Sequence, residues 1–149
     1  MEGQDELKHI GILFKHINKE IIALLNKDLE VYGITLMQNE VLYYIYFNEE
    51  KHDINQKEIQ KFFNSTNPTI TGILNRLQAK GLIKREASTE DARYKIIKLT
   101  EEGRALIGES HKEKAIQMEH RLTKNLTSDE VDQLKELLTK VAKGLKSSF

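Results

Sequence analysis

The sequence predicts a mainly α (α+β) fold, and three observations support this prediction. Apolar residues recur at helical spacing through most of the 149-residue chain. Residues 82–99 instead resemble two short strands joined by a turn-rich tip. The composition, with 31% charged and 39% hydrophobic residues, is that of one helix-rich globular domain. No apolar run of about 18 residues occurs, so no membrane span is expected.

The first predicted helix runs from Asp5 to Glu30. Its apolar residues follow steps of three and four and form a narrow stripe: Leu7, Ile10, Phe14, Ile17, Ile21 and Leu24. Such a stripe favours packing against another helix, including one from a second subunit. His9 and His16, seven residues apart, share one face. They are either a pair of exposed histidines or contacts for a metal or an anionic ligand.

A second helix is expected from Leu36 to Phe47, with Thr35 as its cap. It is apolar on most sides, which places it between layers of the fold. Three tyrosines either line a pocket between those layers or belong to the core, with hydroxyls reaching polar partners at its edge. They are Tyr43, Tyr44 and Tyr46.

A short helix is predicted from Asn55 to Phe63. Asn55 and Glu58 have the spacing of a capping box. Three apolar residues of this helix are expected to face the core: Ile59, Phe62 and Phe63. Gln56 and Lys57 lie in its first turn, where backbone N–H groups and the helix dipole favour a phosphate.

A turn at residues 64–66 leads to another helix, Pro68 to Lys80. Proline is favoured at the first helical position, and Gly81 suits the left-handed conformation after the last turn. One face is an apolar stripe: Ile70, Ile73, Leu74 and Leu77. The opposite face is small and polar: Pro68, Thr71, Gly72, Asn75 and Arg76. This small polar face fits a DNA major groove, which is about 12 Å wide.

Two strands are expected next, Leu82 to Glu86 and Tyr94 to Leu99, with residues 88–93 as the tip. Arg93 and Lys95 lie near that tip. A hairpin that directly follows two helices and a turn, and carries cations at its end, is typical of a DNA-binding wing.

The ordered motifs of residues 67–103 resemble the MarR family of winged-helix transcription regulators. The matching residues are Asn67-Pro68-Thr69-Ile70-Thr71, Arg76-Leu77, Lys80-Gly81-Leu82-Ile83, Arg85, Asp91-Ala92-Arg93, Leu99-Thr100 and Gly103. The flanking helices extend the resemblance to the whole chain. It implies one MarR-like domain, residues 1–149. Within it, residues 35–100 are the winged helix-turn-helix, and residues 1–34 and 101–149 are dimerisation helices.

The formal net charge is zero, but the charge is unevenly distributed. Residues 1–52 hold 5 Lys and Arg against 9 Asp and Glu, whereas residues 53–100 hold 9 against 5. Residues 101–149 are balanced, with 9 of each sign. The positive segment is the predicted DNA-binding segment, as phosphate contact requires, although an excess of four charges also arises by chance.

The resemblance implies contacts with double-stranded DNA from the second helix and the wing. Asn75 could read adenine, and Arg76 either guanine or a phosphate. Arg93 is expected in the adjacent minor groove. Asp91 either braces the wing by ion pairing with Arg85 or is an ordinary turn residue. The predicted contact set is Gln56, Lys57, Asn67, Pro68, Thr69, Thr71, Gly72, Asn75, Arg76, Arg85, Asp91, Arg93 and Lys95.

Two long helices are predicted at the end of the chain. The first runs from Glu101 to Lys124 and has a polar middle that suits a strut. The second follows a capping box at residues 127–130 and is strongly amphipathic: Val131, Leu134, Leu137, Leu138, Val141 and Leu145. The resemblance implies that the terminal helices of two copies intertwine. The expected homodimer would bind a palindromic operator with half-sites about 10 bp apart.

The predicted function is that of a cytoplasmic, sequence-specific DNA-binding transcription regulator, acting as a repressor or, through its position at the promoter, as an activator. The alternative is a winged-helix protein-interaction module without specific DNA binding. No catalytic motif, cofactor or metal-ligand spacing is visible, so neither an enzyme nor a metal site is predicted. The absence of cysteine excludes a thiol-based sensor. The resemblance implies a small aromatic or anionic effector, for which the predicted pocket is His16, Tyr43, Tyr44 and Tyr46.

Overall fold

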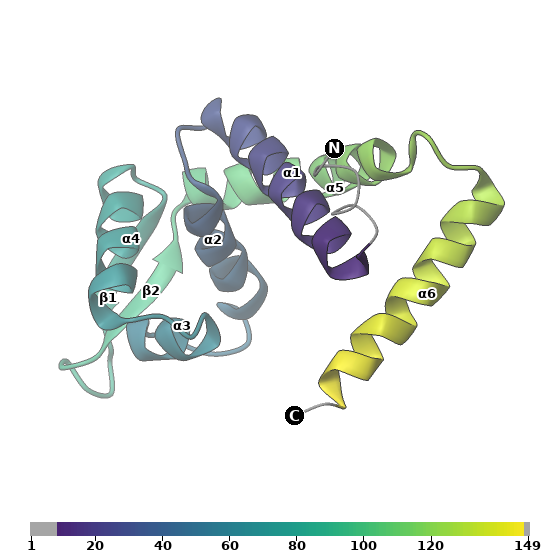
Figure 1. Cartoon of the computed structure of the whole chain (residues 1–149). Coiled ribbons are helices and arrows are strands. Elements are labelled where there is room, and N and C mark those ends of the chain that lie inside the picture. Colours follow the sequence, from purple (N-terminus) through teal and green to yellow (C-terminus); the bar gives the residue numbers. More distant parts are fainter. Residues whose placement is uncertain (1–8, 148–149) are drawn as a thin grey trace. The chain divides into compact units, whose positions relative to one another are not determined.

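The computed structural model describes residues 9–147, apart from the side chains at positions 109, 110 and 112. Six helices and one two-stranded antiparallel sheet follow one another along this part of the chain (Figure 1). This confirms the predicted mainly helical fold with a single hairpin. The elements are α1 (Ile10–Glu30), α2 (Leu36–Asn48), α3 (Gln56–Phe62), α4 (Asn67–Ala79), β1 (Ile83–Ala87), β2 (Lys95–Leu99), α5 (Glu101–Thr123) and α6 (Ser128–Lys146).

The chain forms two compact units, and the boundary between them falls inside α5, after Ile107. In the first unit, α2 contacts α1, α4 and β2 and therefore lies at its centre. Aliphatic side chains from α2, α3, α4, the hairpin and the start of α5 share one core. Its fully buried members include Val41, Leu42, Ile45, Ile59, Ile70, Leu74, Leu77, Ile83, Ile97 and Ile107.

Local sequence signals set the helix ends. Thr35 and Gln38 form a reciprocal capping box at the start of α2, with both N–H···O distances at 3.2 Å. Thr66 caps α4, and Pro68 follows as its second residue. Gly81, with φ +70°, adopts the left-handed conformation just after α4, where a side chain would be strained.

The hairpin is tied to the helices at its base. The register pairs Ile83 with Leu99 and Ala87 with Lys95. The Ile97 N–H donates to the carbonyl of Ile54 at 2.8 Å, so the segment before α3 extends the pairing of β2. The Thr100 hydroxyl donates to the Gly81 carbonyl at 2.6 Å. These bonds fix the direction in which the hairpin leaves the core.

A buried carboxylate joins α2, β2 and α5. The Glu49 side chain is only 6% exposed. It accepts a hydrogen bond from the Leu99 N–H at 2.9 Å and pairs with the guanidinium of Arg104. A buried carboxylate is tolerated because donors of this kind replace its water shell.

Two predictions for α3 are wrong in detail. Phe62 was expected in the core but is 64% exposed, and its ring lies against Tyr44 at a centroid distance of 4.4 Å. In so short a helix, Ile59 and Phe63 occupy the inward positions, and Phe62 falls beside them. The capping box is half formed, since Asn55 accepts from the Glu58 N–H at 3.0 Å while the Glu58 carboxylate bonds elsewhere.

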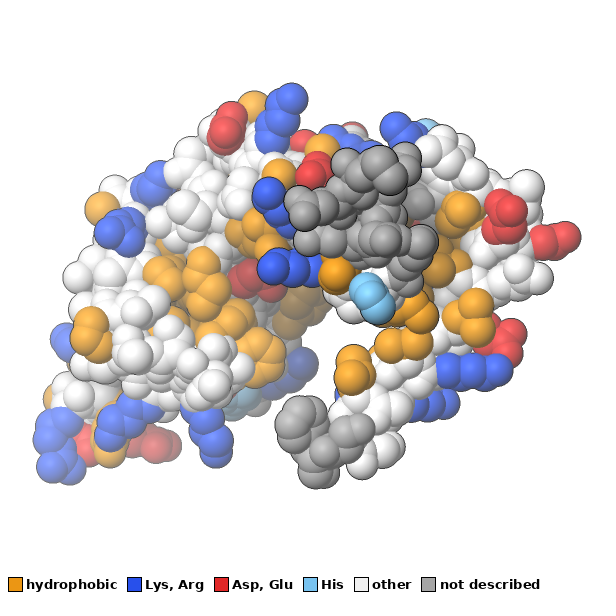
Figure 2. Space-filling view, in the orientation of Figure 1, with side chains coloured by type: hydrophobic (Ala, Val, Ile, Leu, Met, Phe, Trp, Pro, Cys, Tyr) orange, Lys and Arg blue, Asp and Glu red, His pale blue; other side chains and the backbone are white. Residues whose placement is uncertain are grey.

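The second unit contains the later part of α5 and the whole of α6. Thr127 and Glu130 form the predicted capping box, and Lys135 pairs with Glu119 at 2.8 Å. No residue of α6 is buried, although one side of this helix is apolar (Figure 2). None of the helices described is both long and apolar enough to cross a membrane.

Candidate nucleic-acid interface

The two faces of α4 differ as the sequence predicts. Ile70, Ile73, Leu74 and Leu77 are buried against the core. On the other side Pro68, Thr69, Asn75 and Arg76 are exposed, whereas Thr71 and Gly72 are half-buried. The nearest heavy atom to a methyl group added at Gly72 would be Arg76 Nη1, at 3.9 Å. The outer surface of α4 therefore consists of short, mostly polar side chains, and its longest side chain is the cation of Arg76.

Polar side chains join α3 to the start of α4. Gln56 Nε2 donates to Asn67 Oδ1 at 2.7 Å and to Thr71 Oγ1 at 2.6 Å. Gln60 Nε2 donates to the same oxygen of Asn67 at 2.5 Å. Three of the predicted contact residues thus form one network. Gln60 was missed, although its i+4 spacing from Gln56 places both amides on one face of α3.

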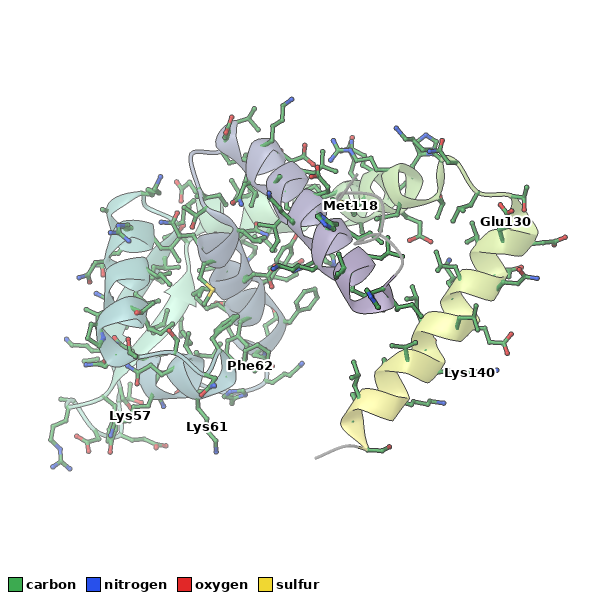
Figure 3. The ribbon with its side chains drawn as sticks, in the orientation of Figure 1. Lys57, Lys61, Phe62, Met118, Glu130 and Lys140 are labelled. Atoms are coloured by element: carbon green, nitrogen blue, oxygen red, sulfur yellow. The ribbon has the colours of Figure 1, made fainter. Side chains whose placement is uncertain are left out.

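Two lysines of α3 add positive charge beside this network. Lys57 and Lys61 are both exposed and point away from the core (Figure 3). Neither side chain contributes to the core, so both are available to a phosphate. Lys57 belongs to the predicted contact set, and Lys61 adds a second cation one turn later.

The hairpin tip is held by local hydrogen bonds. Ser88 Oγ accepts from the N–H groups of Glu90 at 3.3 Å and Asp91 at 3.5 Å. Asp91 pairs with the Arg93 guanidinium, with 2.9 Å between Oδ2 and Nη2. The bond from Arg93 lowers the pKa of Asp91, and the bond to Asp91 raises the pKa of Arg93. Arg93 itself is 88% exposed, as a groove contact requires.

The predicted ion pair between Asp91 and Arg85 is wrong. Arg85 leaves β1 toward α4, where its Nη1 donates to Asn75 Oδ1 at 2.9 Å and to Gln78 Oε1 at 3.1 Å. Asp91 lies beyond the end of β1, in the turn that contains its partner Arg93. Gln78 was missed as a partner, although it lies three residues after Asn75 on the same face of α4.

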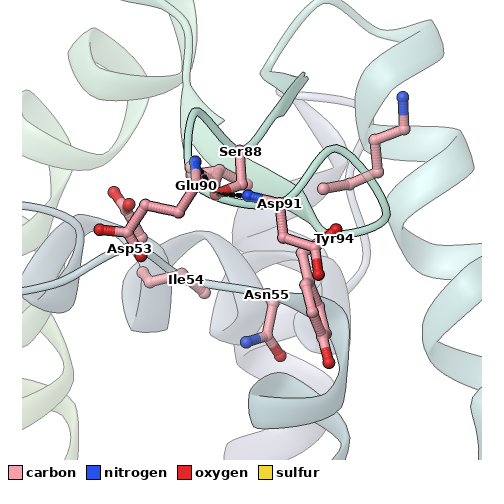
Figure 4. Close-up of a pocket in the computed structure, with 9 residues that line it drawn as sticks. Asp53, Ile54, Asn55, Ser88, Glu90, Asp91 and Tyr94 are labelled. Atoms are coloured by element: carbon pink, nitrogen blue, oxygen red, sulfur yellow. Dashed lines mark hydrogen bonds between the residues drawn. The ribbon is translucent and has the colours of Figure 1, made fainter.

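A hollow of about 330 Å³ lies between the hairpin and the start of α3 (Figure 4). Asp53, Glu90 and Asp91 contribute carboxylates to it, and Lys95 contributes the one cation of its described lining. Like charges repel, so this hollow does not suit a phosphate. Lys95 itself is exposed at the start of β2.

The predicted effector residues are brought together only in part. Tyr43 and Tyr44 line a second hollow, of about 260 Å³, with Phe47, Phe62 and Phe63. Tyr46 is half-buried, and His16 is exposed on α1. Neither of them is among the residues that line this hollow.

One carboxylate at this aromatic cluster receives two donors. The Tyr44 hydroxyl donates to Glu58 Oε1 at 2.5 Å, and His52 Nε2 lies 2.5 Å from the same oxygen. Burial, together with the bond to Glu58, raises the pKa of Tyr44 to about 12. Residue spacing does not predict this contact, because Tyr44 and Glu58 are 14 residues apart on different helices.

Two helices joined by a turn, an exposed polar face on the second helix, and a hairpin with an exposed arginine define a winged helix-turn-helix protein. Comparisons with known proteins agree. A family described as transcriptional regulator SarA/Rot matches residues 23–110. The multiple antibiotic resistance protein MarR of Salmonella typhimurium is 34% identical over 137 residues, covering 92% of this chain and 93% of that protein.

Solved structures give the same result. The crystal structure of MepR, a transcription regulator from Staphylococcus aureus, has a TM-score of 0.82 and 31% identity, covering 92% of this chain and 98% of MepR. A structure of the MepR–DNA complex has a TM-score of 0.72 and 32% identity over the same shares. This chain belongs to the MarR family of winged-helix transcription regulators.

Proposed function

We propose that this regulator binds an inverted-repeat operator in double-stranded DNA as a homodimer and represses transcription there, in the cytoplasm. The main observation in support is the outer face of α4, which combines exposed polar groups with little bulk. A relative of 32% identity, MepR, has been solved in complex with DNA. Other relatives are named as a transcriptional regulator and a transcriptional repressor, and a catalytic role is not part of the proposal.

In this proposal α4 enters the major groove and Arg93 enters the neighbouring minor groove. Bases are contacted from Thr69, Asn75 and Arg76. The other predicted residues bind phosphate or shape the surface, and Lys61 joins them. The segment 53–100 carries a net charge of +4, which supplies the attraction to phosphate.

The proposed homodimer is supported by apolar faces left uncovered on helices at both ends of the chain. On α1, Ile10 is 69% exposed and Ile17 is 50% exposed. On α6, Leu137 is 58% exposed and Leu145 is 64% exposed. Contiguous apolar surface of this kind marks an interaction site in a globular protein. A second copy offers the same faces and the two-fold symmetry of an inverted repeat.

The effector proposed here is a small aromatic compound that binds at the hollow beside Tyr43 and Tyr44. Its described lining is rich in rings and contains the carboxylate of Glu40 but no lysine or arginine. This favours an aromatic ligand over an anionic one. Such a ligand would release DNA by binding more tightly to a state whose two α4 helices do not match the operator spacing.

The experiment that tests the DNA-binding function is selection of duplexes from a random pool at near-physiological salt. Enrichment of an inverted repeat with half-sites about one turn apart, bound with a steep inverse salt dependence, is expected. No enrichment would refute the proposal and favour the protein-interaction module instead.

The dimer is tested separately by light scattering over a dilution series. Leu138→Asp places a charge on the apolar face of α6 and is expected to give monomers at concentrations where the unchanged chain is dimeric. Thr139→Asp introduces the same charge at the next residue, outside the apolar positions of α6, and is the matched control that should remain dimeric. Monomers for the unchanged chain at every concentration would contradict the homodimer.

A further inference from the structure

The guanidinium of Arg85 fixes the orientation of two side-chain amides on α4, those of Asn75 and Gln78. A guanidinium has N–H donors and no acceptor, so each amide atom that faces it has to be a carbonyl oxygen. Arg85 Nη1 lies 2.9 Å from Asn75 Oδ1 and 3.1 Å from Gln78 Oε1. Both amide oxygens are therefore directed toward β1, and the NH₂ groups are left for other partners.

The two terminal nitrogens of Arg85 differ in their surroundings. Nη2 is buried and has no hydrogen-bond partner among the described residues, whereas the bonds that Nη1 makes are exposed. Asn75 and Gln78 are exposed on the outer side of α4. Hydrogen bonds from a charged donor are stronger than those from a neutral one, and one nitrogen of Arg85 binds both oxygens, so the two amides hold this orientation before any ligand arrives.

The orientation restricts what these amides can read. An asparagine that recognises adenine uses its oxygen and its NH₂ group together, on N6–H and N7. Because Asn75 Oδ1 already accepts from Arg85, it is a poorer acceptor for the adenine N6–H, and the NH₂ group becomes the main part of this amide that a base edge meets. Gln78 is restricted in the same way, and Arg76 between them also has donors only.

We propose that Arg85 is a positioning residue for base recognition, and that the Asn75–Gln78 part of α4 reads hydrogen-bond acceptors in the major groove, with guanine preferred. Guanine presents two acceptors there, N7 and O6, whereas cytosine presents a donor. The inference rests on the proposed DNA-binding function. It differs from the sequence-based expectation that Asn75 recognises adenine.

Whether Arg85 orients the amides of Asn75 and Gln78 is tested in the free protein, without DNA. Arg85→Met keeps the length of the side chain and removes the donors. We expect it to shift the side-chain NH₂ signals of both Asn75 and Gln78 in a ¹⁵N-correlated NMR spectrum. Lys84→Met is the matched control, because Lys84 pairs with Glu86 at 2.9 Å, and it should shift neither signal. Unchanged signals in folded Arg85→Met would overturn the inference.

Base reading is tested with the operator obtained from the random pool. For the unchanged protein we expect one guanine per half-site whose replacement by 7-deazaguanine weakens binding on the order of tenfold, the scale of one base contact. Asn75→Ala should abolish that sensitivity. Arg85→Met, and more mildly Arg85→Lys, should admit adenine at this position, while Lys84→Met should not.

The outcomes separate this inference from the function on which it rests. If the unchanged protein selects adenine there, and binding depends on the exocyclic amine of that adenine, the inference is wrong and the DNA-binding function stands. If no motif is enriched, the proposed function fails, and the base-reading claim fails with it. The NMR comparison then still decides whether Arg85 holds the two amides.

Discussion

The carboxylate of Asp91 binds one edge of the Arg93 guanidinium through both of its oxygens at the tip of the hairpin. Arg93 Nη2 lies 2.9 Å from Oδ2, and Nε lies 3.1 Å from Oδ1 and 3.2 Å from Oδ2. The Arg93 backbone N–H adds a bond to Oδ1 at 3.0 Å. Since the arginine is 88% exposed, this pair rather than packing gives the side chain its direction.

Replacing Arg93 with alanine is expected to weaken operator binding on the order of tenfold or more, the scale of one groove contact. Thermal stability should remain close to that of the unchanged protein, because an exposed side chain is removed. Lys140→Ala removes an equally positive, 69% exposed side chain from α6 and serves as the control in a fluorescence anisotropy titration. Equal affinities for the two variants would contradict the wing assignment.

The buried carboxylate of Glu49 predicts a large difference between two neighbouring glutamates. Glu49→Gln removes a charge that pairs with Arg104 and is expected to lower the free energy of unfolding by about 2 kcal/mol. Glu50 lies 3.8 Å from the same arginine but is 83% exposed, so Glu50→Gln should change it by less than about 0.5 kcal/mol. Urea unfolding measures both, and equal losses would exclude a special role for Glu49.

Gly103 stands where a side chain has no room. An added Cβ would lie 2.0 Å from the carbonyl oxygen of Leu82, a backbone atom that cannot turn aside. Gly103→Ala is therefore expected to lower the free energy of unfolding by about 2–3 kcal/mol. At Gly72, inside α4, an added Cβ would make only an ordinary contact with Arg76 Nη1 at 3.9 Å, so Gly72→Ala should be neutral or stabilising by up to about 1 kcal/mol. Both are measured by chemical denaturation, and equal effects would contradict the close approach.

The burial of Tyr44, together with its bond to Glu58, predicts a change of stability in alkali. Because the pKa of Tyr44 is raised from 10.0 to about 12 in the folded chain, its stabilising contribution is complete below pH 10. It is lost as the pH rises from there through about 12. Tyr44→Phe should cost about 1 kcal/mol at pH 7, the value of a typical hydrogen bond. The difference in free energy of unfolding between Tyr44→Phe and the unchanged chain should become smaller between pH 10 and 12.

The measurement for this prediction is chemical denaturation of both chains at a series of pH values. A deficit that stays constant from pH 8 to pH 12 would show that the Tyr44 proton is not held by the fold.

The sequence predicted what short-range chemistry determines. Pro68 and Gly81 set the limits of α4 to within a residue or two, and the spacing of four aliphatic residues identified its buried face. The hairpin was also predicted, because its tip sequence closes through its own side chains. The exposed position of Arg93 followed from that turn.

The errors arose where one element meets another. As two opposite charges of the wing, Arg85 and Asp91 are a plausible pair by sequence, but the placement of β1 beside α4 directs Arg85 to Asn75. Phe62 was assigned to the core by helical spacing, which does not show how far a seven-residue helix is covered. The second role of Glu58 required knowing that α2 and α3 bring Tyr44 beside it. Such contacts depend on the angle between elements, and residue spacing does not encode that angle.

The uncovered leucines of α6 have a consequence for the dose of this regulator. Only a dimer of two copies can bind both halves of an inverted repeat. At concentrations where most chains are monomers, the number of dimers rises with the square of the number of chains made. Halving synthesis would leave about a quarter of the active species. Because no residue of α6 is buried in the single chain, the regulated gene would have a threshold number of repressor chains. Below that number the repressor is present but does not bind the operator.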